Sequence, residues 1–136
     1  MSHYPRVEHI AIAVENLEAA ISVYAAILGR LDSGRETVES EGVRIGFFDL
    51  GGARLELLEP LSEDSPVGRF LTRRGPGLHH LALEVDDIEA ALERCRAAGL
   101  RTVGDAPRQG AGGRLVAFLH PEGTGGVLVE LSQAPG

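Results

Sequence analysis

A segment that occurs twice decides the fold of this chain: HIAIAVENLEAAISVYAAILG at residues 9–29 and HLALEVDDIEAALERCRAAG at residues 80–99. At an offset of 71 residues, His9 meets His80, and the triplet Glu-Ala-Ala of the first copy meets the same triplet of the second. Self-similarity at a fixed spacing indicates repeated supersecondary units. The sequence therefore predicts an internal duplication.

Later segments extend the duplication. Leu-Glu-Leu at residues 55–57 matches Val-Glu-Leu at residues 129–131 at an offset of 74. Phe48 matches Phe118 at an offset of 70, and the offset changes where loops carry insertions, as at residues 123–126. Both halves of the chain are therefore expected to contain the same elements in the same order.

Each half reads as a strand, a helix and three further strands. The first strands alternate branched apolar residues with small or polar ones, which is typical of strands with one buried face. Asn16 and Asp87 are suited to cap the helices that follow, and Gly29 and Gly99 to end them. The strands are predicted at residues 7–14, 31–38, 43–50 and 53–59 in the first half, and at residues 80–85, 100–103, 115–119 and 126–132 in the second.

The chain is predicted to be one α+β domain, residues 1–136, built from tandem βαβββ modules. The linker between the modules contains Ser-Pro, which is a good helix start, and Gly-Pro-Gly, which ends a helix. The parts are module one at about residues 6–59, a linker at about residues 60–77 with a helix at residues 65–74, and module two at about residues 78–133.

The composition argues against several classes of function. The 136 residues carry a net charge of −7, which argues against nucleic acid as the main partner. The single cysteine, Cys95, allows no intramolecular disulfide and no thiolate metal cluster, and it suits a reducing compartment. The chain has no apolar run of membrane-spanning length and no signal peptide pattern, so we expect a cytoplasmic protein without a membrane partner.

The two halves place one histidine and one glutamate each on the same face of their strands. His9 and His80 are in the first strands, and Glu56 and Glu130 are in the last. All four face away from the residues expected to pack on the helices. A pseudo-twofold axis would bring these two imidazoles and two carboxylates together, which suits Co²⁺, Mn²⁺, Ni²⁺ or Zn²⁺ better than Ca²⁺. The alternative is a polar cavity without function.

Two other histidines are expected to be structural. His79 neighbours His80, but it points to the opposite face of the strand. His120 precedes Pro121 at a turn, where a histidine more often supports the backbone than reacts. The register of the strand therefore selects His80 as the ligand, and a one-residue shift of register would select His79 instead.

Longer motifs carry a family resemblance across residues 7–133. They are HIAIAV followed by NLEAA, LELLEPL, EDSPVGRFL, GLHHLALEVDDI, GAGGRLVAFLHP and GVLVELSQ. With them the chain resembles the vicinal oxygen chelate superfamily, also called the glyoxalase superfamily, and within it the methylmalonyl-CoA epimerases. The resemblance implies an open, curved eight-stranded sheet around a metal-binding cavity, and it implies a homodimer.

The resemblance also implies the chemistry. It assigns a divalent metal ion, Co²⁺ first, to His9, Glu56, His80 and Glu130. The reaction that it implies interconverts (R)- and (S)-methylmalonyl-CoA by abstraction of the proton α to the thioester, through a metal-stabilised enolate. Glu130 is the first candidate for the base. Ethylmalonyl-CoA is larger by one methylene and fits the same chemistry.

One position departs from this resemblance. Some of these epimerases carry a glutamate in a Gly-Val-x-Glu run, where this chain has Ile45. An isoleucine transfers no proton, so the group that serves the second face of the substrate is left open among Glu41, Glu56 and a metal-bound water.

The stretch PRQGAGGR at residues 107–114 is expected to meet the phosphates of coenzyme A. Backbone N–H groups and arginine side chains both suit an anion of this kind. The alternative is a flexible connection between two strands. The expected contacts are Arg108, Gly110, Gly112, Gly113 and Arg114.

Three other functions fit parts of the pattern. A glyoxalase I-type lactoylglutathione lyase would use a similar ligand set on a glutathione hemithioacetal. An iron dioxygenase needs two histidines and one carboxylate, so Glu56 would be surplus. A drug-binding module would have a cavity without a catalytic metal. Metal content and substrate distinguish these alternatives.

Overall fold

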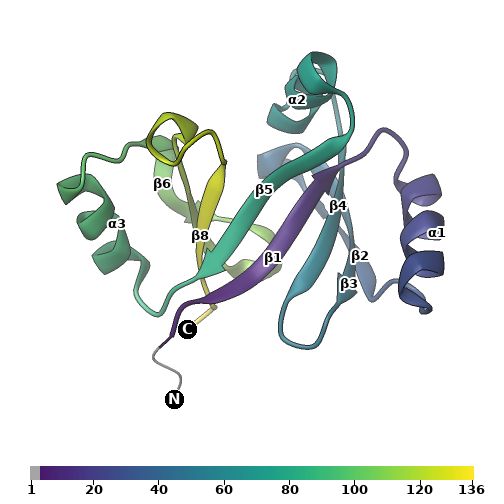
Figure 1. Ribbon diagram of the computed structural model, residues 1–136, viewed down its shortest axis with the longest axis horizontal. Helices are drawn as coiled ribbons and strands as arrows, with labels where there is room; N and C mark the ends of the chain where they lie inside the picture. Colours follow the sequence, from purple (N-terminus) through teal and green to yellow (C-terminus); the bar gives the residue numbers. More distant parts are fainter. Residues whose placement is uncertain (1–3) are drawn as a thin grey trace. The chain divides into compact units, whose positions relative to one another are not determined.

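The structure is a computed structural model that describes residues 4–136. Residues His9–His79 form one compact unit, and His80–Gly136 form the other together with residues 4–8 (Figure 1). We call them the first and the second unit. The linker predicted between the modules, its helix included, lies within the first unit. Within residues 4–136, no helix has both the length and the apolar character needed to cross a membrane.

The first unit has the predicted order of elements. Its strands are hydrogen-bonded in the order β2-β3-β4-β1, with β1 parallel to β4 and the other neighbours antiparallel. The elements are β1 (Arg6–Ala13), α1 (Leu17–Leu28), β2 (Gly34–Val38), the 3₁₀ turn η1 (Glu39–Glu41), β3 (Val43–Asp49), β4 (Arg54–Pro60) and α2 (Pro66–Arg74).

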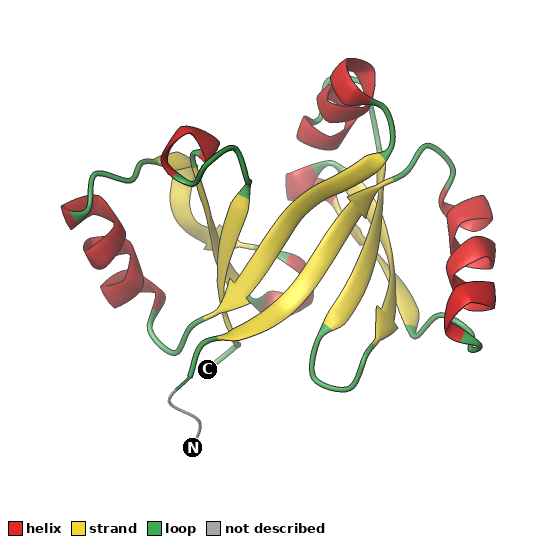
Figure 2. Ribbon diagram, in the orientation of Figure 1, coloured by secondary structure: helices red, strands yellow, loops and turns green. Residues whose placement is uncertain are grey.

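The second unit repeats this order. Its strands pair in the order β5-β8-β7-β6, again with the first strand parallel to the last (Figure 2). The elements are β5 (Gly77–Glu84), α3 (Ile88–Ala97), β6 (Thr102–Gln109), η2 (Ala111–Gly113), β7 (Leu115–Leu119), η3 (Pro121–Gly123) and β8 (Val129–Gln133). The duplication predicted from the sequence is confirmed.

The starts of α1 and α3 use the same two devices. The side chain of Asn16 accepts a hydrogen bond from the Ala19 N–H, at 3.0 Å. In the second unit Asp87 accepts one from Ala90 at 3.1 Å. Both caps are therefore as predicted, and they satisfy N–H groups that have no partner inside the helix.

The last strand of each unit supplies a second acceptor to the helix. A carboxylate oxygen of Glu59, on β4, accepts from the Leu17 N–H at 3.0 Å. The Gln133 amide oxygen, on β8, accepts from the Ile88 N–H at 2.8 Å. Because Gln133 follows Glu59 at the same offset of 74 residues as Glu130 follows Glu56, this contact is part of the duplication.

Each unit has its own apolar core between helix and strands. In the first unit, α1 packs on β3 and β4, and in the second α3 packs on β8 (Figure 1). Cys95 packs against the second core as a partly buried side chain. The buried cores are Val14, Leu17, Ile21, Phe48, Leu55 and Leu57 in the first unit, and Ile88, Ala91, Leu92, Ala117, Leu119 and Leu131 in the second.

The match of Phe48 with Phe118 is wrong. Phe118 lies opposite Glu130 in the β7–β8 ladder, and the residue opposite Glu56 in the β3–β4 ladder is Phe47. Phe47 is therefore the counterpart of Phe118. The error has a physical reason: residues 47 and 48 are both phenylalanine, so residue type does not fix the register, and neighbouring residues of a strand face opposite sides.

The sixth strand is longer than predicted. The sequence indicated a strand at residues 100–103, whereas β6 runs from Thr102 to Gln109. Its register shifts between Val103 and Arg108, and Gly104 and Pro107 lie in the interrupted part. Glycine and proline inside a strand mark such irregularities, so the sequence pattern gave no continuous strand signal.

Candidate active site

The first histidine–glutamate pair lies on adjacent parallel strands. His9 comes from β1 and Glu56 from β4, where Ala11 is the ladder partner of Glu56. The His9 Nδ1 is 3.5 Å from the Glu56 Oε2, and the two side chains are only 7% and 3% exposed. The neighbours Leu55 and Leu57 point to the opposite face and pack in the apolar core of the unit. The alternation of β4 thus buries a carboxylate on the face away from the helix.

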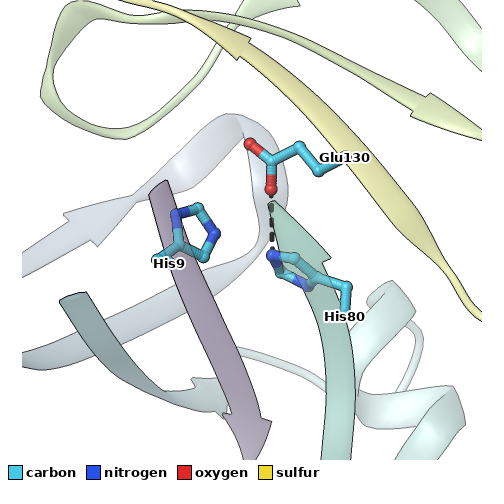
Figure 3. Close-up of side chains that lie close together, drawn as sticks. All are labelled: His9, His80 and Glu130. Atoms are coloured by element: carbon cyan, nitrogen blue, oxygen red, sulfur yellow. Dashed lines mark ion pairs between the residues drawn. The ribbon is translucent and has the colours of Figure 1, made fainter. Parts of the chain in front are cut away.

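The second pair has the same origin in its own unit. His80 comes from β5 and Glu130 from β8, with Ala82 as the ladder partner of Glu130. The His80 Nε2 is 2.9 Å from the Glu130 Oε1, drawn as the dashed line in Figure 3. The two side chains are 6% and 7% exposed. The imidazole of His80 also packs against the Phe118 ring in a T-shaped arrangement, with the two centroids 5.2 Å apart.

The ladders make the two pairs equivalent. Each has an alanine of the first strand opposite the glutamate of the last, at matching offsets of 71 and 74 residues. A buried carboxylate is costly unless a cation or hydrogen-bond donors accompany it. Each pair offers one imidazole and one carboxylate, a donor set that suits borderline divalent metals. The residues of both units therefore fit the metal that the resemblance implies.

Arg54 lies beside the first histidine–glutamate pair, and the sequence pattern did not predict it there. Its Nη2 lies 2.6 Å from the Glu56 Oε2, and its guanidinium carbon lies 4.8 Å from the centroid of the Phe47 ring. A signal for it existed, because a residue two positions before Glu56 lies on the same face of a strand. A pattern of metal ligands does not include it, because arginine side chains do not bind metals.

A second missed cluster surrounds Glu84 at the end of β5. Its carboxylate pairs with Arg6 at 2.9 Å and, through its other oxygen, with Arg114. The Arg114 Nε also donates to the Ser132 hydroxyl at 2.6 Å. The guanidinium of Arg114, which was expected to meet phosphate, is thus engaged inside the second unit and is only 16% exposed.

The stretch expected to meet coenzyme A is only partly a loop. Arg108 belongs to β6 and lies over the Phe118 ring, 5.6 Å from its centroid. The Gly110 N–H donates to the Arg114 carbonyl at 2.9 Å, and a Cβ at Gly110 would meet Val116 at 2.9 Å. Gly112 and Gly113, in η2, have φ of 67° and 73°. The absence of side chains therefore serves packing at the first glycine and backbone conformation at the next two.

The two histidines expected to be structural make structural contacts. The His79 ring packs edge-on against Phe70 of α2, with centroids 5.0 Å apart. The His120 Nδ1 accepts from the Glu122 N–H at 3.1 Å and begins η3. His79 thus packs against α2 through Phe70.

Ile45 and Glu41, the two residues discussed for the second proton transfer, lie in a strand and in a turn respectively. Ile45 is buried in β3 opposite Leu58 and is 5% exposed. Glu41 lies in η1, the turn that precedes β3, and is followed by Gly42 with φ of 68°. Glu41 is therefore part of a turn and not of the strand that carries Ile45.

Comparisons with known proteins agree with the fold. Residues 8–118 match the family described as the Glyoxalase/Bleomycin resistance protein/Dioxygenase superfamily. The chain is 43% identical to the methylmalonyl-CoA epimerase, mitochondrial, of Homo sapiens, over 95% of this chain and 74% of that protein. It is also 43% identical to the ethylmalonyl-CoA/methylmalonyl-CoA epimerase of Cereibacter sphaeroides, over 94% of this chain and 97% of that one.

A solved structure gives the same result in three dimensions. A variant of the Streptomyces coelicolor methylmalonyl-CoA epimerase, in complex with 2-nitronate-propionyl-CoA, has a TM-score of 0.89 and 37% identity. The match covers 96% of this chain and 98% of that one, so the predicted fold class is confirmed. The chain belongs to the glyoxalase/bleomycin resistance protein/dioxygenase superfamily and, within it, to the methylmalonyl-CoA epimerases.

Proposed function

We propose that this chain interconverts the two C2 epimers of methylmalonyl-CoA by removing and returning the proton beside the thioester. The observation that carries this proposal is the buried histidine–glutamate pair that occurs in each unit at equivalent ladder positions. Relatives that are 43% identical bear the names of methylmalonyl-CoA or ethylmalonyl-CoA epimerases, which favours a CoA thioester over a glutathione hemithioacetal.

The proposal includes one divalent metal ion held by both pairs together, His9 and Glu56 with His80 and Glu130. Co²⁺ is the first candidate, with Mn²⁺, Ni²⁺ and Zn²⁺ as alternatives, because imidazole and carboxylate donors accept all four. When bound, such an ion supplies Lewis-acid stabilisation of negative charge that develops on the substrate's oxygens.

Glu130 is the proposed base. Its carboxylate is buried, with a 7% exposed side chain, and His80 holds one of its oxygens at 2.9 Å. A carboxylate in such a place accepts the C2 proton from one face of the substrate, and its position on a rigid strand sets the direction of transfer. Ile45 has no proton to give, so the group that serves the other face must be a different residue or a water molecule.

The proposal also covers recognition of the CoA arm at residues 107–114. Arg108 is the first contact we propose, with the backbone of Gly112 and Gly113 beside it. We propose that Gly110 and Arg114 keep this stretch in its conformation, because the Gly110 N–H donates a hydrogen bond to the Arg114 carbonyl. A homodimer and a cytoplasmic location complete the proposal. Light scattering on the purified chain and fractionation of the cells that express it test them.

Solvent deuterium incorporation tests the proposed reaction. Methylmalonyl-CoA is incubated in D₂O with the chain loaded in turn with Co²⁺, Mn²⁺, Ni²⁺ or Zn²⁺, and mass spectrometry follows C2. We expect metal-dependent uptake of one deuteron and none after EDTA treatment. Exchange that survives complete metal removal would contradict the role of the metal. Lack of exchange with all four metals, together with turnover of the hemithioacetal, would replace the proposal with a glyoxalase I activity.

A further inference from the structure

Glu56 and Glu130 differ in the residue two positions before them in the sequence. Arg54 precedes Glu56 on β4, and both side chains lie on the same face of the strand. The Arg54 Nη2 donates to the Glu56 Oε2 at 2.6 Å, and the His9 Nδ1 lies 3.5 Å from the same oxygen. Charge-assisted hydrogen bonds of this length are among the strong ones in proteins. One oxygen of Glu56 is therefore held in a fixed direction.

The guanidinium of Arg54 is itself held in place. It lies over the Phe47 ring at 4.8 Å from the centroid, and Phe47 is the ladder neighbour of Glu56 on β3. A Cβ added at Gly34 of β2 would lie 2.9 Å from that ring, so the backbone of β2 supports the ring closely. A cation over a confined aromatic face has few other positions to adopt.

The second unit keeps the aromatic residue, and the arginine over it, Arg108, comes from β6 and not from the strand that carries the glutamate. Phe118 is opposite Glu130, as Phe47 is opposite Glu56. The residue two positions before Glu130 is Leu128. The duplication therefore preserves the carboxylate and its ring and differs in the charged neighbour on the same strand.

We propose that Arg54 is a positioning residue that fixes Glu56 as a permanent ligand and leaves proton transfer to Glu130. The inference rests on the proposed metal site. Groups that hold a ligand from behind set its orientation and commonly change metal affinity when they are removed. A carboxylate with one oxygen held by an arginine does not swing toward a substrate carbon. This removes Glu56 from the candidates for the second acid or base.

The test compares metal binding in Arg54→Met, Arg54→Lys and a matched control. Isothermal titration measures the Co²⁺ affinity, and the visible absorption of bound Co²⁺ reports its coordination geometry. We expect Arg54→Met to weaken Co²⁺ binding by about 10- to 100-fold and to change the spectrum. Arg54→Lys should restore most of the affinity. The control is Arg101→Met, which loses an exposed pair with Glu122 and should leave both readings unchanged.

A double-mutant cycle separates positioning from general damage. In a Glu56→Gln background, Arg54→Met should change the Co²⁺ affinity by less than about 3-fold, because its partner charge is gone. In a Glu130→Gln background its full effect should persist. Circular dichroism and urea unfolding in EDTA check that each variant is folded. If Arg54→Met does not fold, the same cycle with Arg54→Gln decides, and an effect that is equal in both backgrounds overturns the inference.

The outcomes also separate this inference from the proposed function. If the unmodified chain binds no Co²⁺ and exchanges no C2 proton, the proposed function fails and the positioning role fails with it. If the unmodified chain binds Co²⁺ and catalyses exchange while Arg54→Met keeps the same affinity and spectrum, only the positioning role is overturned.

Discussion

Glu130 is the side chain on which the proposed reaction depends most directly. Glu130→Gln keeps the size and the buried hydrogen-bonding capacity of the residue and removes its ability to accept a proton. We expect deuterium exchange at C2 to fall by about 10²- to 10⁴-fold, the usual contribution of a general base. The measurement is the exchange rate at saturating Co²⁺, with the urea midpoint as a check on folding. An unchanged rate would contradict the role of Glu130 as base.

The adjacent histidines give a residue-scale prediction with a built-in control. His80→Ala removes a proposed ligand, so bound Co²⁺ and activity should both be lost. His79→Ala removes the ring contact with Phe70 and no proposed ligand, so it should keep the metal and lower stability by about 1 kcal/mol. Metal analysis of the two purified variants decides. Loss of metal from the His79 variant instead would show that the strand register around these residues differs.

The residues differ in how far the sequence predicts them. The pairing of His9 with Glu56 and of His80 with Glu130 was predictable, because each member has a counterpart on the same strand face in the other half. Arg54 has Leu128 at the matching position of the second half, so the duplication does not point to it. The contact between Glu84 and Arg114 was not predictable either, since 30 residues separate them and only the pairing of the strands brings them together.

At the scale of elements, the helix caps are the features that the sequence predicts best. A cap depends on residues within three positions of one another, so local sequence suffices. The length of β6 depends on pairing with β7 across an interruption, and the sequence alone predicted only its first part. The contacts of Glu59 and Gln133 with the helices could not be predicted from local patterns, because each joins the two ends of a module.

The duplicated caps predict matched effects on stability. Asn16→Ala and Asp87→Ala each remove a side-chain acceptor from the first turn of a helix. Each should lower the free energy of unfolding by about 1 kcal/mol in urea titrations. Glu15→Ala, an exposed neighbour of the first cap, should change it by less than about 0.5 kcal/mol. Equal stability of Asn16→Ala and the unmodified chain would show that Glu59 alone supports the start of α1.

At the scale of the whole molecule, a metal that binds only the folded chain must stabilise it. With free Co²⁺ at 100 times its dissociation constant, the gain is about 2.7 kcal/mol, and EDTA should reverse it. Thermal unfolding with and without Co²⁺ measures this change. A double variant, Glu56→Ala with Glu130→Ala, should show no increase of Tm with Co²⁺. An equal increase in the double variant would place the stabilising ion elsewhere on the chain.

The pairing of the first strand of each unit with its last has a consequence for how the chain folds. His9 and Glu56 are 47 residues apart in the sequence, and His80 and Glu130 are 50 apart. Contacts of such high sequence separation form slowly, because the loop between them must close first. Neither pair exists until the first strand of its unit has paired with the last. Metal uptake during refolding would therefore be a late event, and its rate would report this pairing of the strands.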